Sequence, residues 1–423
     1  MKNKRKIIND PVYGFLQIPS DLIFEIIQHP FFQRLRRIKQ LGLAEMVYPG
    51  AVHTRFQHAL GAMHLMGQAL DVLSSKGHPI DEAEKESAQI AILLHDLGHG
   101  PFSHVLEKQL LHQVPHEWLS AQLMGQLNIQ FQGKLTTALA MFHGTYPRPF
   151  FHQLISGQLD MDRMDYLKRD SFFTGVVEGT IGVERLIKML HVVDDRLVVE
   201  EKGLLSVENF LNARRLMYWQ VYLHRTAIAA ESMLTAILER VRWLIQNETS
   251  PFLEGPLAYF LSHSVSKTWV NEHSEALHQF SLLDDMDIFF HIKKWQFDSD
   301  AILSYLAKRL IQRDLFSIEL KSMPLPESYI KLPLPPGFSE ESRAYFVRQG
   351  QVSNKGYLPE GSQIWILTKQ GSVVDIAEAS DLPTIKALSH IVKKYYVSSA
   401  NPIYLSVNLG SGLADSSTIH PVS

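Results

Sequence analysis

The sequence of 423 residues contains no cysteine. This absence excludes disulfide bonds, thiolate metal sites and cysteine nucleophiles. A metal ion bound by such a chain must be held by histidine, aspartate or glutamate.

The sequence also lacks a large excess of either charge and any long apolar run. The 41 lysines and arginines nearly balance the 44 aspartates and glutamates, so we expect no extensive contact with nucleic acid or with an anionic membrane. No apolar run approaches the length of a membrane-spanning helix. The basic start is followed by Asn9-Asp10-Pro11, where a signal peptide needs apolar residues. We therefore expect a cytoplasmic protein.

Apolar residues recur at three- and four-residue spacing through most of residues 20–320, as in 56–73, 82–94 and 207–245. That spacing predicts helices. Proline is frequent from 323 to 337, which indicates a linker. Beyond it we expect a hairpin of strands at 363–367 and 372–376, a helix near 382–394 and a strand at 403–407. The fold class we predict is mainly α, with a helical core at 1–255, a helical extension at 256–322, the Pro-rich linker at 323–337 and a small α+β unit with a frayed tail at 338–423.

Histidine is abundant, with 20 residues, and two segments concentrate it beside acids. The segment 53–58 opens a predicted helix, and the segment 90–104 closes another on the adjacent pair His95-Asp96. Both side chains of this pair can reach a metal ion at a helix end, and the glycines that follow let the chain turn back. Imidazole and carboxylate ligands suit manganese, iron, nickel, zinc or magnesium.

Four segments carry a resemblance to a known family: 54–61 (TRFQHALG), 95–104 (HDLGHGPFSH), His116-Glu117, and 160–170 (DMDRMDYLKRD). In order and spacing, from about Lys6 to Phe316, the sequence resembles HD-domain deoxynucleoside triphosphate triphosphohydrolases, of the type of the animal sterile-alpha-motif/HD enzyme and its bacterial homologues. The resemblance implies that residues 1–255 form an all-α HD-domain catalytic core. It also implies one divalent metal ion, with additional Mg²⁺ accompanying the nucleotide.

The resemblance assigns roles residue by residue. It implies that the metal ligands are His58, His95, Asp96 and Asp162. A proton for the leaving 5′-oxygen would come from His104, because the pKa of histidine lies near working pH, and His116 with Glu107 or Glu117 would orient that acid. His99 and Arg55 would contact the α-phosphate.

Further positions match residues around the rest of the nucleotide. Arg163 and Arg214 would hold phosphates, Tyr166 and Tyr222 would line the sugar, and Gln40 and Asp170 would bind the 3′-hydroxyl. An activator nucleotide at a subunit interface would contact Lys6, Asn9, Gln33, Arg36 and Arg185, in a homo-oligomer that is a tetramer or a dimer. The sequence departs from guanine-reading relatives at Gln28, where they have aspartate, and at Leu223, where they have glutamine.

The function we predict is metal-dependent hydrolysis of a deoxynucleoside triphosphate (dNTP) to a deoxynucleoside and inorganic triphosphate. One alternative is another HD reaction, that of a nucleoside monophosphatase, a guanosine tetraphosphate hydrolase or a cyclic-nucleotide phosphodiesterase. The other is a non-catalytic nucleotide sensor or a nucleic-acid-binding module. The intact set of ligands argues against a sensor, and the balanced charge makes nucleic acid an unlikely partner.

Overall fold

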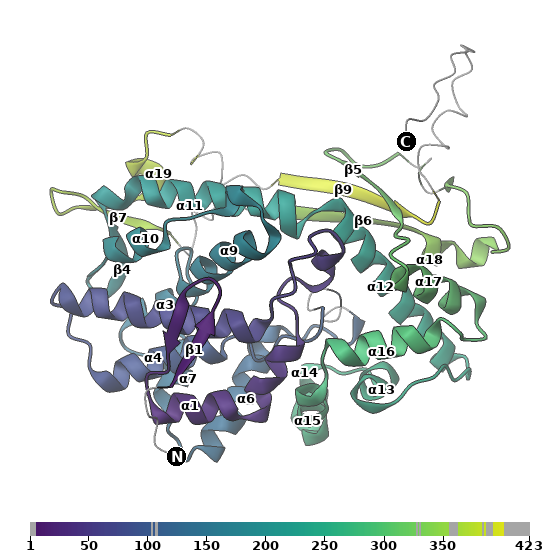
Figure 1. Ribbon diagram of the computed structural model, residues 1–423, viewed down its shortest axis with the longest axis horizontal. Helices are drawn as coiled ribbons and strands as arrows, with labels where there is room; N and C mark the ends of the chain where they lie inside the picture. Colours follow the sequence, from purple (N-terminus) through teal and green to yellow (C-terminus); the bar gives the residue numbers. More distant parts are fainter. Residues whose placement is uncertain are drawn as a thin grey trace, which may run out of the picture.

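The computed structural model describes residues 6–102, 105, 109–326, 329, 331–354, 363–382, 385 and 392–401. Helices make up most of it, with short strands at the edges (Figure 1). This confirms the predicted mainly helical fold with strands in the C-terminal region. Among the described residues, no helix is long and apolar enough to cross a membrane.

Helix α3 (Arg55–Ser75) lies at the centre of the fold. Its buried residues occupy nearly every side of the helix, as expected of a helix surrounded by protein. A capping box between Thr54 and Gln57 fixes its start. It packs against α4 (Glu82–Leu94) and α9 (Met161–Thr174). This packing brings the start of α3, the end of α4 and the start of α9 together.

The remaining helices of the N-terminal half surround this centre (Figure 1). The N-terminal hairpin of β1 (Ile7–Asp10) and β2 (Gly14–Gln17) packs on α3 through β2. The other helices and helical turns are α1 (Asp21–Gln28), α2 (Pro30–Arg34), η1 (Leu35–Arg37), η2 (Gly42–Met46), α6 (His116–Gln130), α7 (Thr136–Phe142), α8 (Pro149–Ile155), η3 (Val177–Gly179), α10 (Val183–Met189) and η4 (Glu201–Gly203).

The predicted long helix at 207–245 is interrupted. The chain forms α11 (Leu204–Met217), a π-helical turn η5 (Tyr218–Tyr222) and then α12 (Arg225–Gln246). His224 caps α12 by accepting the backbone N–H of Thr226. Apolar periodicity continues across the break, so it could not reveal the turn, which points Tyr218 and Tyr222 at the same cavity.

Helices continue after α12 as far as residue 311, and the first and the last of them pack against α12 (Figure 1). They are α13 (Gly255–Ser262), α14 (Lys267–Glu272), α15 (Ser274–Leu282), α16 (Asp285–Trp295) and α17 (Ala301–Ile311).

The C-terminal strands complete sheets that earlier segments begin. The predicted hairpin is confirmed as β7 (Trp365–Leu367) and β8 (Val373–Asp375), and β7 also pairs in parallel with β4 (Arg196–Glu200), itself paired with β3 (Leu190–Val193). A second sheet places β9 (Val392–Ser399) between β5 (Ser317–Lys321) and β6 (Val347–Asn354), along the upper edge of Figure 1. The short elements η7 (Glu340–Ser342), α18 (Arg343–Phe346) and α19 (Ile376–Ala379) complete this part. One buried core includes residues from Leu16 to Ala400, and the boundaries at 255, 322 and 337 stay predictions.

The helix predicted near 382–394 is wrong at 392–394, which open strand β9. Tyr395, Tyr396 and Val397 favour a strand, and β9 gains backbone hydrogen bonds from a neighbour on each side. The rest of that predicted helix lies mostly outside the described residues, as do the strand predicted at 403–407 and the tail.

Candidate metal centre

Three helix ends bring His58, His95 and Asp162 into one cluster. His58 lies in the first turns of α3, His95 caps the end of α4, and Asp162 lies in the first turn of α9. Their ligand atoms all lie within 4.8 Å of one another. Asp162 Oδ1 is 3.1 Å from His58 Nε2 and 3.4 Å from His95 Nε2.

Both histidines use Nδ1 for a hydrogen bond within the protein, so that Nε2 faces Asp162. His58 Nδ1 donates to Asp165 Oδ2 at 2.7 Å, and His95 Nδ1 donates to the carbonyl of Ile92 at 2.6 Å. Both Nε2 atoms are buried, and their contacts with Asp162 lack the geometry of a hydrogen bond. Buried imidazole nitrogens without hydrogen bonds, facing a carboxylate, fit a metal ion: ligands about 2.1 Å from a shared ion lie roughly 3.0–3.4 Å apart.

Asp96 lies beside this cluster and is held by Arg55. Its Oδ2 accepts from Arg55 Nη1 at 2.6 Å and is 3.7 Å from His58 Nε2, while Oδ1 is 3.2 Å from His95 Nε2. Burial opposes ionisation of Asp96, but His95, His99 and Arg55 hold its pKa well below the usual range. The structure thus brings all four predicted ligands together, with Asp96 also engaged by an arginine.

The charges at the centre favour a cation. With neutral histidines, the carboxylates outnumber the guanidiniums by two, an excess that a divalent ion would balance. Burial lowers the pKa of His58, but the nearby carboxylates outweigh burial and raise it to about 10. The groups in this balance are Asp10, Asp96, Asp162 and Asp165 against Arg55 and Arg169.

A cavity of about 430 Å³ extends from the cluster. Apolar and aromatic side chains, such as Phe142, Ile155 and Tyr218, form much of its wall. Its lining includes most of the residues predicted for metal binding, catalysis and substrate binding: Gln40, Arg55, His95, Asp96, His99, His116, Glu117, Asp162, Arg163, Tyr166, Asp170 and Tyr222.

The histidines predicted for catalysis lie at the metal end of this cavity. His99 Nε2 is 3.3 Å from Asp96 Oδ1, and the rings of His99 and His116 stack with centroids 3.8 Å apart. Burial, with Arg55 next, lowers the pKa of His99 well below the ordinary value. His116 Nε2 is 3.3 Å from Glu117 Oε1. The predicted acid His104 and its possible partner Glu107 lie outside the described residues.

The residues predicted to contact the sugar lie at another part of the lining. Asp170 accepts from His53 Nε2 at 2.7 Å and from the Tyr222 hydroxyl at 2.8 Å. The Tyr222 and Tyr166 rings have centroids 6.0 Å apart. Gln40 Oε1 is buried and has no hydrogen-bond partner among the described residues, so it is available to a ligand.

The two arginines predicted for phosphate are partly engaged within the protein. Arg163 donates to Asp160 through Nη1, and Arg214 Nη1 donates to Gln158 Oε1 at 2.8 Å. The Nε atoms of both arginines are buried and have no partner among the described residues. Arg214 is buried and does not line the cavity in the described part of the chain.

The residues predicted for an activator lie on separate elements. Lys6 covers the ring of Phe24, and Asn9 is in β1. Gln33 accepts from Arg36 Nε at 2.9 Å, whereas Arg185 of α10 donates to Ser206 and to the carbonyl of Lys202. Their binding of a nucleotide stays a prediction.

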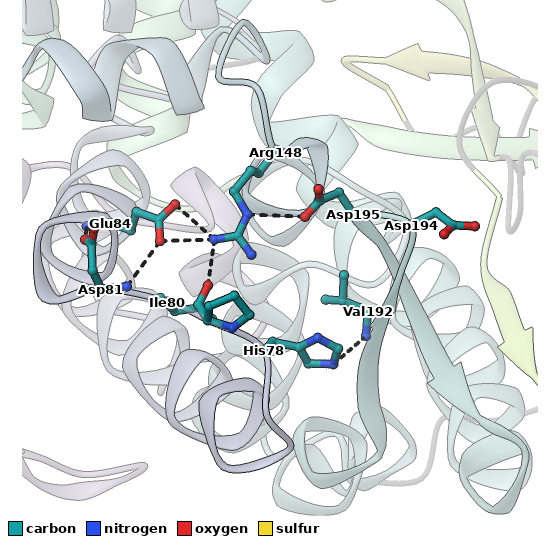
Figure 2. A pocket seen from close by; sticks show the side chains of 9 residues that line it. His78, Ile80, Asp81, Glu84, Arg148, Val192, Asp194 and Asp195 are labelled. Carbon is teal, nitrogen blue, oxygen red and sulfur yellow. Dashed lines mark hydrogen bonds and ion pairs between the residues drawn. The ribbon is translucent and has the colours of Figure 1, made fainter.

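A larger hollow of about 740 Å³ lies near the turn between β3 and β4 (Figure 2). Arg148 points across it and donates to Glu84, to Asp195 and to the carbonyl of Pro79, while His78 accepts the backbone N–H of Val192. These groups satisfy one another. The smaller cavity is the candidate site because it contains the cluster of metal-ligand types.

The sequence did not single out four buried residues that support the site. His53 holds Asp170, and Asp165 holds His58, while Arg169 and Asp10 continue the chain of ion pairs behind Asp165. Only the spacing of four residues between Asp165 and Arg169 was readable from the sequence.

The metal-ligand residues His58, His95, Asp96 and Asp162 lie in a region that matches a known family. Residues 55–170 match the HD domain, and residues 181–251 match the HD associated region. The uncharacterized protein YwfO of Bacillus subtilis is 36% identical over 321 residues, which span 74% of this chain and 72% of that protein. Human deoxynucleoside triphosphate triphosphohydrolase SAMHD1 is 29% identical over 278 residues, 54% of this chain and 44% of the human protein. The crystal structure of a phosphohydrolase from Bacteroides thetaiotaomicron is 48% identical, with a TM-score of 0.90 over 94% of this chain and 100% of that chain.

Proposed function

The chain belongs to the HD-domain phosphohydrolases, and within that family we propose that it hydrolyses dNTPs to a deoxynucleoside and inorganic triphosphate. The observation that carries the proposal is the continuity of one cavity from the metal-type cluster to Tyr166 and Tyr222. Similarity to proteins named deoxynucleoside triphosphate triphosphohydrolases supports the choice of substrate.

The metal centre of this proposal consists of His58, His95, Asp96 and Asp162. A divalent ion held there would lower the pKa of a bound water and polarise a phosphoryl oxygen. Arg55 holds the Asp96 carboxylate from the other side, so Asp96 keeps its orientation and its negative charge.

Cationic and neutral donors around the cluster suit a triphosphate. Arg55 and Arg163 line the cavity, and their guanidiniums offer planar donor pairs to phosphate oxygens. His99 is neutral at neutral pH because its pKa is lowered, so one ring nitrogen donates and the other accepts. We propose that His99 and Arg55 contact the α-phosphate and that Arg163 contacts the rest of the triphosphate. Arg214, which does not line the cavity in the described part of the chain, would stabilise the triphosphate through its charge.

In the proposed reaction, the water oxygen bonds to the α-phosphorus while the bond from that phosphorus to the 5′-oxygen breaks. The departing 5′-oxygen needs a proton, which histidine can supply near neutral pH. By the family resemblance we assign this role to His104, with His116 and Glu117 as its orienting partners. His116 stacks on His99 beside the centre.

The sugar would lie between the two tyrosines and Asp170. Asp170 fixes the Tyr222 hydroxyl at 2.8 Å, so the Tyr222 ring has one orientation. A ring packed on C2′ leaves no room for a ribose 2′-hydroxyl, and Gln40 with Asp170 would bind the 3′-hydroxyl. We propose this packing as the basis of selectivity for deoxyribose.

Regulation by a nucleotide in a homo-oligomer is a further part of the proposal. The contact residues would be Lys6, Asn9, Gln33, Arg36 and Arg185, and the assembly a tetramer or a dimer. The match of these five positions to the family pattern supports it.

The test is incubation of the purified protein with each dNTP and NTP over Mn²⁺, Fe²⁺, Ni²⁺, Zn²⁺ and Mg²⁺, with identification of the phosphate products. We expect inorganic triphosphate and a deoxynucleoside from dNTPs, and no turnover of NTPs. Asp96→Ala should lower the rate by at least about 10³-fold, since it removes a ligand that orients the water. Asp195→Asn, an acid of the other hollow, is the matched control and should leave the rate unchanged. Release of monophosphate or pyrophosphate would favour another HD reaction instead.

A further inference from the structure

A chain of buried ion pairs extends from the metal ligand His58 to the N-terminal hairpin. His58 is hydrogen-bonded to Asp165, and Arg169 forms a bidentate ion pair with the same carboxylate. Arg169 Nε is 2.9 Å from Asp165 Oδ2, and Arg169 Nη2 is 3.0 Å from Asp165 Oδ1. The Nη1 of Arg169 donates to Asp10 Oδ2 at 2.8 Å. All four side chains are 3% exposed or less.

Asp10 belongs to the hairpin turn as well as to this chain. It ends strand β1, and its Oδ1 accepts the backbone N–H groups of Val12 at 2.9 Å and Tyr13 at 3.0 Å. One oxygen therefore shapes the turn between β1 and β2, while the other binds Arg169. Through these two sets of hydrogen bonds, Asp10 connects the N-terminal hairpin to the chain of ion pairs.

Gly61 of α3 makes room for the same chain. A Cβ at this position would lie 2.0 Å from Asp165 Oδ1 and 2.3 Å from Arg169 Nη2. Glycine is less favourable than alanine within a helix. Gly61 therefore lowers the stability of α3 at the position where the Asp165 and Arg169 side chains approach the helix backbone.

We propose that Asp165, Arg169 and Asp10 are positioning residues that hold His58 Nε2 toward the metal, so that the N-terminal hairpin is part of the metal centre's support. The inference rests on the metal site of the proposed function. A carboxylate on Nδ1 fixes the tautomer and ring orientation of His58 and makes Nε2 a stronger ligand. Arg169 in turn fixes the carboxylate, and Asp10 neutralises and orients Arg169.

A purely structural role would predict a different result. Loss of a buried ion pair destabilises the fold wherever the pair lies, but only a positioning role changes metal affinity. The matched control is Arg240, a partly buried arginine that donates to Asp300 at 3.0 and 2.6 Å on other elements of the fold. Substitution of Arg240 also removes a bidentate ion pair, but it leaves the ion pairs between His58 and Asp10 intact.

The test measures Mn²⁺ affinity of the full-length protein by the electron paramagnetic resonance signal of free Mn²⁺. The variants are Asp10→Asn, Arg169→Lys, Arg169→Met, His58→Ala and the control Arg240→Met, each also followed by thermal unfolding without metal. Asp10→Asn keeps an acceptor for the turn but removes both the charge and the acceptor oxygen that face Arg169. A second pair of variants is Gly61→Ala and Gly125→Ala. Gly61 lies against the Asp165 and Arg169 side chains, whereas a Cβ on Gly125 would meet no atom within 4 Å.

We expect Asp10→Asn to raise the Kd for Mn²⁺ about 10-fold and Arg169→Met to raise it about 10- to 100-fold. The Kd of Arg169→Lys should lie between these two, because lysine keeps the positive charge but cannot form two parallel hydrogen bonds to Asp165. Gly61→Ala should weaken binding, whereas Gly125→Ala and Arg240→Met should leave the Kd within about twofold. Lower melting temperatures for Asp10→Asn and Arg169→Lys with an unchanged Kd would overturn the positioning role. Wild-type protein whose Mn²⁺ binding is absent, or survives His58→Ala, would overturn the metal centre itself.

Discussion

At the scale of the residue, Asp285 is a buried acid with only one of its two carboxylate oxygens hydrogen-bonded among the described residues. It begins α16 with 1% of its surface exposed, and its Oδ2 accepts the backbone N–H of Lys39 at 2.9 Å. Its Oδ1 is buried and has no hydrogen-bond partner among the described residues. Burial is the main cause that raises its pKa to about 7, and neighbouring Asp284 adds to the rise.

This raised pKa predicts the direction in which stability depends on pH. An unfolded aspartate has a pKa of about 3.9, so between about pH 4 and pH 7 the folded protein keeps a proton that the unfolded chain releases. The Asp285 contribution to stability is therefore lost as the pH rises through this window. We expect Asp285→Asn to reduce the fall in unfolding free energy between pH 5 and pH 8 by about 1–3 kcal/mol, measured by urea denaturation.

The control is Asp71→Asn, whose side chain is 66% exposed, and it should leave the dependence on pH near that of the wild type. An Asp285→Asn variant with the wild-type slope between pH 5 and pH 8 would contradict the assignment of this buried proton.

Single residues also show how far the sequence could predict the site. The metal-type residues His58, His95 and Asp162 were predicted from local motifs, and the structure brings them together. The partners behind them were not, because Asp10 and Arg169 are far apart in the sequence and meet only when the hairpin packs on the helices. A lone buried acid such as Asp10 looks like a turn residue, which it also is.

At the scale of the element, the fold places three helix ends at one point. The end of α4 and the starts of α3 and α9 expose polar groups and leave room for side chains to converge. Apolar periodicity predicted α3 and α4 well because both are long and repeat apolar residues at three- and four-residue spacing. It could not predict the π-helical turn η5, nor the pairing of β9 with β5 and β6, because both depend on contacts with distant segments.

The parallel pairing of β7 with β4 gives a prediction at this scale. Ile366 of β7 is fully buried opposite Val199, whereas Val373 of β8 is 37% exposed. We expect Ile366→Ala to lower the unfolding free energy by about 2–4 kcal/mol and Val373→Ala by less than about 1 kcal/mol. Chemical denaturation of both variants measures this difference. Equal effects would mean that β7 does not join the cooperative core.

At the scale of the whole molecule, one cavity joins the cluster of metal ligands to the aromatic end of the pocket. Its lining comes from segments spread between residues 39 and 231, so the site exists only when the helices around α3 pack together. Local motifs therefore predicted which residues matter, whereas the cavity that unites them required the folded chain. The cluster of metal ligands with Arg55 and Arg163 at one end, and the tyrosines at the other, suit a ligand with an anionic part and an apolar part.

The central claim is that water attacks the α-phosphorus of a dNTP at this centre, and hydrolysis in ¹⁸O-labelled water tests it most directly. Mass spectrometry of the products should find one ¹⁸O in inorganic triphosphate and none in the deoxynucleoside, because the new bond forms to phosphorus and the bond to the 5′-oxygen breaks. Label in pyrophosphate or in a nucleoside monophosphate, or no hydrolysis with any of the five metals, would contradict the account.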